Sequence, residues 1–160
     1  MAWWQFLFGK RGSSAQREGV SMYEALSEDQ VSVDVLERVF QAAFLRTERD
    51  TDGDLLVRDE SGINTFVRVD SERKIVTFFS LWGLKEEFPE GEKLRLANEL
   101  NDQLVVVRFT VRSPRVLWCD HQFLYAGGMS PITIIAAYRR FVSVCREVPR
   151  RDMLGIVGAD

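Results

Sequence analysis

The sequence predicts an α+β domain in which helices pack on an antiparallel sheet. Two clusters of segments alternate apolar and polar residues with a period of two, which is typical of half-buried strands. Apolar residues recur at three- and four-residue spacing before, between and after these clusters, which is typical of amphipathic helices. The predicted order is α-β-β-β-α-β-β-α. Helices that flank an antiparallel sheet in this way are expected to cover it and to share its core.

The first helix is predicted to begin after Ser32, whose hydroxyl can accept a hydrogen bond from a free N–H of the first turn. An earlier start at Ser27 is also open, because Ser27 and Gln30 have the spacing of a capping box. Residues 11–29 are polar and contain glycine, so they predict a mobile linker. The apolar stripe of the helix consists of Leu36, Val39, Phe40, Ala43 and Phe44.

Three strands in meander order are predicted at residues 55–57, 63–69 and 74–82, joined by polar turns. The third strand is apolar on both faces over residues 75–82. A strand of this composition is either central in its sheet or covered by a partner. We therefore expect Phe78, Ser80 and Trp82 to contribute to a protein-binding surface.

A second helix is expected before residue 104, with an apolar stripe of Leu94, Ala97, Leu100 and Leu104. On another side of this helix, Asn98 and Asn101 are expected to cap adjacent backbone. A hairpin of two strands follows at 104–112 and 116–125, because Ser113-Pro114 interrupts the period-two pattern. The apolar faces of the hairpin carry Val105, Val107, Phe109 and Val111, then Leu117, Cys119, His121, Phe123 and Tyr125.

The closing helix follows Gly127-Gly128, which ends the second strand of the hairpin because glycine tolerates positive φ. Ser130 is expected to cap this helix through its hydroxyl. Pro131 suits the first helical position, where its missing N–H costs nothing. Apolar spacing extends the helix to Val148, and Pro149 ends it.

The composition is that of an ordinary globular chain. Its 160 residues are enough to bury a hydrophobic core without stabilising disulfides or metal ions. The proportions of hydrophobic (46%) and charged (28%) residues are typical of globular domains. A net charge of −3 and a pI near 5.3 argue against a nucleic-acid-binding protein, which usually carries a basic domain or stripe. Cys119 and Cys145 fall on apolar faces and no secretory signal is visible. Both are therefore expected to be reduced, and the protein cytoplasmic.

Three parts are expected along the chain: an aromatic segment with a polar linker at 1–31, the α+β domain at 32–149, and a tail at 150–160. Trp3 and Trp4 lie in an apolar run too short to cross a bilayer, which takes about 20 residues. Indole rings near basic residues suit the lipid headgroup boundary, so peripheral contact with the inner membrane is one interpretation. Packing of both tryptophans on the domain or on a second copy is the other.

The order of elements, with NELN at 98–101, the hairpin after it and AGGMSP at 126–131, resembles the YbjN family. GDLLV at 53–57 and FFSLW at 78–82 belong to the same resemblance, which spans residues 32–148. This family is described as bacterial sensory transduction regulators with a fold like that of type III secretion chaperones. The resemblance implies a non-enzymatic module that binds other proteins, often as a homodimer. It supplies no catalytic residues to carry over.

His121 is the only histidine of the chain and shares a strand face with Cys119. Such a pair could bind a metal or activate a thiol. A zinc site needs three or four ligands, however, and Cys145 is expected on a distant helix. A histidine held by a neighbouring polar group is the favoured interpretation.

Two other motifs admit a functional and a structural interpretation. The acidic turn at 50–54 resembles a calcium loop with Gly53 in sixth position, but Glu48 and Asp59 would take the first and twelfth positions, where Asp and a bidentate Glu are expected. A strand follows instead of a helix, which favours a hairpin turn. Gly127-Gly128 could cradle an anion at a helix start, but the lysine of a phosphate loop is missing. A strand-to-helix turn is the simpler explanation.

Two functions are compatible with these patterns. The first is a non-enzymatic protein-binding regulator or chaperone-like adaptor of the bacterial cytoplasm, which binds another protein and forms a homodimer without cofactor or metal. Its expected binding residues are Phe78, Ser80, Trp82, Trp3 and Trp4. The alternative is a small-molecule sensor or enzyme with a pocket near His121, Tyr125 and the Gly127-Gly128 turn.

Overall fold

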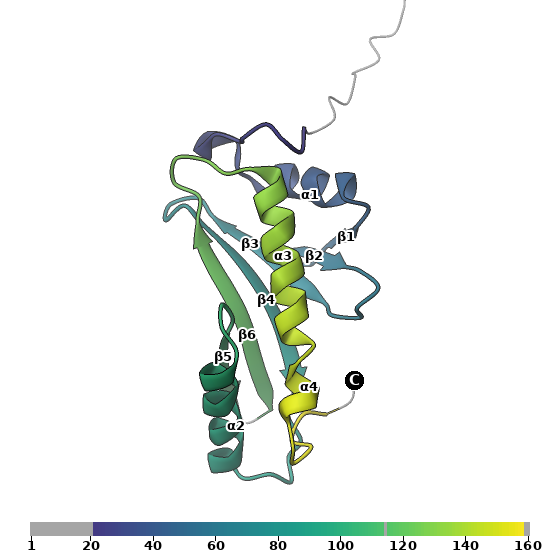
Figure 1. The fold of residues 1–160 in the computed structure, drawn as a ribbon, viewed down its shortest axis with the longest axis vertical. Coiled ribbons are helices and arrows are strands. Elements are labelled where there is room, and N and C mark those ends of the chain that lie inside the picture. The colour runs from purple at the N-terminus through teal and green to yellow at the C-terminus, as the bar shows by residue number, and fades with distance from the viewer. Residues whose placement is uncertain (1–20, 114, 159–160) are drawn as a thin grey trace, which may run out of the picture.

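The computed structural model describes residues 21–113 and 115–158 of the chain (Figure 1). The strands form one antiparallel sheet in the order β1-β2-β3-β4-β6-β5. These strands are β1 (Arg46–Arg49), β2 (Leu55–Arg58), β3 (Thr65–Asp70), β4 (Ile75–Gly83), β5 (Arg108–Ser113) and β6 (Val116–Leu124). The helices are η1 (Glu28–Gln30), α1 (Val33–Ala42), α2 (Glu90–Gln103), α3 (Pro131–Cys145) and α4 (Val148–Arg151). The predicted α+β class is therefore confirmed. Within these residues, no helix is long and apolar enough to span a membrane.

The main core lies between the sheet and the helices α1 and α3, which cover one of its faces (Figure 1). Phe78 of the central strand β4 is fully buried there. Its ring centroid lies 6.2 Å from that of Phe40 in α1 and 6.3 Å from that of Tyr138 in α3. Helix α2 packs beside the edge strand β5 and adds Leu96 and Leu100 to the same core. One continuous apolar layer thus joins all three long helices to the sheet.

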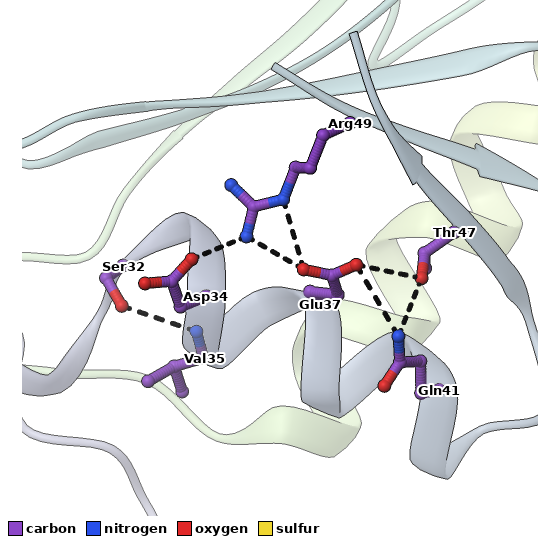
Figure 2. Close-up of polar contacts among 7 residues, drawn as sticks. All are labelled: Ser32, Asp34, Val35, Glu37, Gln41, Thr47 and Arg49. Carbon is purple, nitrogen blue, oxygen red and sulfur yellow. Dashed lines mark hydrogen bonds and ion pairs between the residues drawn. The ribbon is translucent and has the colours of Figure 1, made fainter. Parts of the chain in front are cut away.

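The prediction of three strands before α2 is wrong, because β1 precedes them as a fourth. Its sequence is Arg-Thr-Glu-Arg, which has none of the apolar alternation that marks a strand. Polar contacts hold β1 to α1 instead (Figure 2). Arg49 donates to Asp34 and Glu37 at 2.7 and 2.8 Å, and Thr47 donates to Glu37 at 3.2 Å. Side-chain chemistry across two elements, invisible to a periodicity argument, secures this edge strand.

The predicted start of α1 is confirmed, since the Ser32 hydroxyl accepts a hydrogen bond from the N–H of Val35 at 3.3 Å. The capping box of Ser27 and Gln30 also forms, but it encloses the short helix η1. The prediction for the far end of α1 is wrong at Phe44. This residue follows the helix with φ 62° and is 97% exposed, so it does not belong to the apolar stripe.

Three other details differ from the prediction. Leu94 of α2 is exposed, because Leu96 and Ala97 take the buried side of the helix. Strand β5 begins at Arg108 instead of residue 104, since the chain must first turn away from α2 and leaves Val105 exposed. Ser130 precedes α3 as expected, but its hydroxyl makes no capping hydrogen bond.

Both segments that flank the domain in the prediction pack against it where they are described. Leu26, placed in the expected linker, pairs with Met129 through two backbone hydrogen bonds of 2.9 Å. Ile156, placed in the expected tail, is 1% exposed, and Val157 forms a bridge with Leu84. A mobile linker over 21–29 is therefore wrong. The rest of that expected linker lies outside the described residues.

Candidate protein-binding face

Strand β4 presents alternate residues to opposite faces of the sheet. Phe78, Ser80 and Trp82 all point toward the helices. Phe78 is fully buried, Ser80 is 3% exposed, and Trp82 is half-buried against the same core. The folded chain therefore offers no surface of Phe78 to a partner and almost none of Ser80. A role for these residues in protein binding stays a prediction, and Trp3 and Trp4 lie outside the described residues.

The opposite face of the sheet, which we call the open face, carries its own apolar row. The open-face row consists of Leu56, Phe66, Phe79 and Trp118, from the strands β2, β3, β4 and β6. The rings of Phe66 and Phe79 stack with centroids 5.1 Å apart, and those of Phe79 and Trp118 stack at 4.5 Å. Leu56 and Phe79 are buried, yet neither belongs to the main core. The row is a second, separate apolar cluster.

Arginine side chains lie over two of the rings of the open-face row. The guanidinium of Arg68 lies 5.1 Å from the centroid of the Phe79 ring, and that of Arg112 lies 3.8 Å from the Trp118 ring. Such cation–π contacts are worth about 0.5–1 kcal/mol at exposed sites. The indole N–H of Trp118 is buried beneath this layer and has no hydrogen-bond partner in the described part of the chain.

Acidic residues pair with Arg68 and Arg108 of the open face, whereas Arg112 forms no ion pair within the described residues. Arg68 forms a bidentate pair with Asp54, whose hydrogen bonding raises the pKa of the guanidinium. Arg108 donates to both carboxylate oxygens of Asp120, at 3.1 and 2.8 Å, and Asp120 is 2% exposed. Each pair joins neighbouring parts of the sheet surface. The open face therefore combines aromatic rings with two arginine–aspartate pairs and one arginine that lies over an indole ring.

The residues predicted to line a small-molecule pocket, near His121 and the Gly127-Gly128 turn, make contacts within the fold instead. Nδ1 of His121 lies 2.9 Å from the carbonyl oxygen of Val106, to which it can only donate. The N–H of Gly127 donates to the carboxylate of Glu28 at 2.9 Å. A Cβ at Gly128 would lie 2.3 Å from the carbonyl oxygen of Leu26. A histidine held by a polar neighbour and glycines required by the turn are thus what the structure shows.

The acidic residues at 50–54 form the turn of the β1–β2 hairpin, as the favoured interpretation predicts. The Asp50 carboxylate accepts hydrogen bonds from the N–H groups of Asp52 and Asp54 at 2.9 and 2.8 Å. Gly53 has a φ of 85°. Across residues 21–113 and 115–158, no group of three or more His, Cys, Asp and Glu side chains is placed to hold a metal ion.

The expectation that Cys145 lies far from Cys119 is wrong. Helix α3 crosses the sheet so that the two thiols meet in the core, where both residues are fully buried. Burial raises the pKa of the Cys119 thiol well above its ordinary value, and the neighbouring Cys145 thiol adds to this effect. A thiol kept protonated in this way is a poor nucleophile. The sequence could not show the contact, because it depends on where α3 crosses β6.

The expected backbone cap of α2 is confirmed for Asn101. Its carboxamide accepts from the N–H of Phe109 at 2.9 Å and donates to the carbonyl oxygen of Phe109 at 2.8 Å. Phe109 belongs to β5, an edge strand of the sheet. One side chain thus takes the place of a neighbouring strand there. Asn98 is exposed.

Sequence reasoning recognised that β4 is apolar on both faces but could not tell which of the two faces meets solvent. The signal for the open-face row was present at Phe66 and Trp118, two aromatic residues at positions where their strands alternate outward. Their joining into one row required the strand order, in which β6 lies next to β4.

The fold, with helices on one face of an antiparallel sheet, is similar to that of type III secretion chaperones. The SchA chaperone in a structure titled "Structure of the HopA1-SchA Chaperone-Effector Complex" matches with a TM-score of 0.53 and 10% identity, over 73% of this chain and 91% of that one. The chaperone SycH of Yersinia pestis, solved with a fragment of YscM2, matches with a TM-score of 0.46 and 14% identity over 75% and 98%.

The chain belongs to the YbjN family, whose model, "Putative bacterial sensory transduction regulator", matches residues 32–150. The structure of YbjN from E. coli, titled as a "putative transcription regulator", matches with a TM-score of 0.65 and 12% identity. The match covers 81% of this chain and 97% of that one. No sequence among the curated proteins matches.

Proposed function

We propose that this protein is a non-enzymatic, protein-binding regulator or chaperone-like adaptor of the bacterial cytoplasm, and that the open-face row is its binding surface. The carrying observation is the stack of Phe66, Phe79 and Trp118 on a sheet face that α1 and α3 do not cover. Aromatic residues with arginine dominate the energetics of protein interfaces. The fold shared with a chaperone solved in complex with its effector supports the same proposal.

The electrostatics of the open face favour a protein over a nucleic acid as partner. Stacked aromatic rings with arginines also suit nucleic-acid bases. A nucleic-acid surface, however, needs unneutralised positive charge for the phosphates. Here Asp54 pairs with Arg68 and Asp120 pairs with Arg108, in a chain of net charge −3. Although Arg112 lacks an acidic partner within the described residues, a polar rim around an aromatic centre is the pattern of a protein–protein interface.

A homodimer is part of the proposal, and the open-face row can be tested as its interface. Light scattering gives the mass of the purified chain, and quantitative capture from its native cytoplasm gives its partners. In the variant Phe66→Ser/Trp118→Ser we expect partner recovery to fall about tenfold or more, because interface aromatics are the commonest hot spots. Leu124→Ser is the matched control, since Leu124 is 71% exposed on the same face but outside the row.

The outcomes separate the two uses of this face. A dimer that dissociates in the double variant assigns the row to self-association. A dimer that persists while a captured partner is lost assigns the row to that partner. A monomer that captures nothing, or equal recovery by the double variant and Leu124→Ser, would contradict the proposal. Circular dichroism of each variant confirms that it is folded.

The sensor alternative has no specific observation in its favour. The ring nitrogen Nδ1 of His121 and the N–H of Gly127 are both engaged by groups of the fold. Tyr125 is 1% exposed, and its hydroxyl faces the carbonyl oxygen of Asp70 at 3.4 Å. A groove between α3 and the β1–β2 end of the sheet is lined by other residues.

Peripheral membrane contact through Trp3 and Trp4 is a separate proposal that rests on the sequence. We expect the full chain to partition onto anionic liposomes more strongly than a variant with serine at both positions, because interfacial indoles contribute directly to such binding. Equal partition of the two proteins would contradict it.

A further inference from the structure

A groove of about 900 Å³ lies between the outer side of α3 and the β1–β2 end of the sheet. We call it the arginine groove. Its size is in the range of clefts that hold ligands. The turn at 59–61 and the link between α1 and β1 complete its walls. The lining side chains that concern binding are Phe44, Arg46, Leu56, Arg139, Val142 and Arg146.

The charges along this groove are unbalanced toward positive. Within the described residues, Arg46, Arg139 and Arg146 form no ion pair, whereas a fourth lining arginine, Arg58, is paired with Glu48 at 3.1 Å. Two other carboxylates line the groove. Asp59 accepts from the N–H of Ser61 at 2.8 Å, and Glu60 is exposed. Among the described residues of the groove, three arginines without an ion-pair partner therefore face two carboxylates without one, in a chain that is acidic overall.

The floor of the groove is apolar. Leu56 is 9% exposed and Val142 is 5% exposed, so both contribute hydrophobic surface beneath the arginines. A site for a small inorganic anion needs no such floor. The combination suits a ligand that carries both carboxylates and apolar side chains.

Phe44 stands at the mouth of the groove in a conformation that packing does not explain. It occupies the C′ position of a Schellman motif, with hydrogen bonds from Leu45 N–H to the Phe40 carbonyl and from Phe44 N–H to the Gln41 carbonyl, both 3.0 Å. Glycine is the usual residue there, because φ is positive. Phe44 has a φ of 62° and is 97% exposed. Its backbone is strained and its ring gains no burial in return, which points to a contact with another molecule.

We propose that the arginine groove binds an extended, acidic segment of another protein. Its carboxylates pair with Arg46, Arg139 and Arg146, and an apolar side chain enters between the floor and the Phe44 ring. Arg139 and Arg146 are seven residues apart on α3, or about 10 Å along the helix. Three residues of an extended chain cover about the same distance. The groove borders the open-face row at Leu56, which belongs to both. It is a second binding site, which goes beyond the proposed function of the open-face row and is tested with residues outside that row.

The test uses the full chain and fluorescence anisotropy with a labelled peptide of about twelve residues that repeats Glu-Leu, a length that spans such a groove when extended. A Lys-Leu repeat of equal length is the charge control. We expect the acidic peptide to bind, its affinity to fall with salt, and the basic peptide not to bind. The double variant Arg139→Glu/Arg146→Glu should weaken binding about a hundredfold, since charge-assisted pairs contribute about tenfold each.

Two variants separate a binding role from a structural one. Arg140→Glu makes the same charge change on the same helix at an exposed residue outside the groove, and we expect it to bind as the wild type does. Phe44→Gly should unfold at a higher temperature than the wild type, because it relieves the positive φ, yet bind the peptide several times more weakly. Phe44→Tyr should retain the affinity. Opposite changes in stability and affinity are not produced by a merely structural residue.

Several results would overturn the proposal. The first is that the wild type does not bind the acidic peptide at roughly millimolar protein, the weak end of peptide recognition. The second is that the basic peptide binds as tightly as the acidic one. The third is that Arg140→Glu loses as much affinity as Arg139→Glu/Arg146→Glu. Unchanged affinity in Phe44→Gly would remove Phe44 from the site. Displacement of the peptide by micromolar inorganic phosphate or citrate would make it a small-anion site instead. None of these variants alters Phe66 or Trp118, so failure here leaves the open-face row untouched.

Discussion

Phe78 and Phe79 are neighbours in the chain and lie on opposite faces of β4. Phe78 is fully buried and meets Phe40, Phe123 and Tyr138 edge to face. Phe79 is stacked flat between two rings and lies under a guanidinium. The covered face is made of interlocking side chains from four elements. The open face is one layer of side chains supported only by the sheet.

This difference shows that burial of a single residue does not identify the core. Phe79 is only 5% exposed, yet its neighbours are themselves at the surface. The covered face stabilises the fold, whereas the open face is the surface that we propose for binding a partner. The predictions below test this distinction, beginning with the largest expected effect.

Phe78→Ala should cost about 3–5 kcal/mol of unfolding free energy, because it leaves a cavity that the surrounding helices and sheet cannot fill. Phe79→Ala should cost about 1–2 kcal/mol, because its neighbours can relax toward the space and water can enter. Urea unfolding followed by circular dichroism measures both. Equal losses would mean that the open face is packed as rigidly as the core, so the two faces of β4 would not differ in stability.

Arg108→Met should cost about 2–3 kcal/mol, because it leaves the carboxylate of Asp120 buried without its partner. Asp120 is 2% exposed, while Arg108 itself is 58% exposed. Arg112→Met is the matched control on the same strand, and it should cost about 0.5–1 kcal/mol for the lost contact with Trp118. Adding Asp120→Asn to Arg108→Met should restore part of the loss. A double variant that is weaker still would show that desolvation is not the cause.

Asn101→Ala should cost about 1–2 kcal/mol, because the N–H and carbonyl groups of Phe109 lose their hydrogen-bond partner at the sheet edge. Asn98→Ala on the same helix should stay within about 0.5 kcal/mol, as is usual for an exposed substitution. Hydrogen exchange of the Phe109 amide gives a local readout. Slow exchange retained in Asn101→Ala would mean that α2 shields β5 without this side chain.

Tyr138→Phe should change stability at neutral pH by no more than about 0.5 kcal/mol, because the buried hydroxyl has no hydrogen-bond partner among the described residues. Burial, reinforced by the charge of Asp59, raises the pKa of Tyr138 above its ordinary value of 10.0. The folded state therefore holds this proton more tightly than the unfolded state above about pH 10, and stability falls there as pH rises.

The wild type carries this hydroxyl and should therefore lose more stability than Tyr138→Phe between neutral pH and about pH 11. A pH near 11 is about one unit above the pKa of tyrosine in the unfolded state. Urea unfolding of both proteins at the two pH values measures the difference. Burial also raises the pKa of Cys119, but this thiol is present in both proteins and cancels in the difference. Parallel pH dependence of the two proteins would contradict the assignment to Tyr138.

Local patterns in the sequence determined the order of the helices and most strands. The hydroxyl cap at Ser32, the hairpin around residue 114 and the amide cap at Asn101 each depend on residues a few positions apart. The alternation of β4 was equally readable. Contacts of this range follow from backbone geometry and side-chain chemistry alone, so one sequence is enough to predict them.

Only the tertiary structure decided which side of β4 meets solvent, because a period of two marks two faces without saying which one the helices cover. It also decided that Cys119 meets Cys145 and that the Glu28 carboxylate accepts a hydrogen bond from the N–H of Gly127. The polar strand β1 likewise forms only in the tertiary structure. Each of these contacts joins residues that are brought together by the packing of α1 and α3 on the sheet. The free energy that selects them belongs to the whole core, and no local segment carries it.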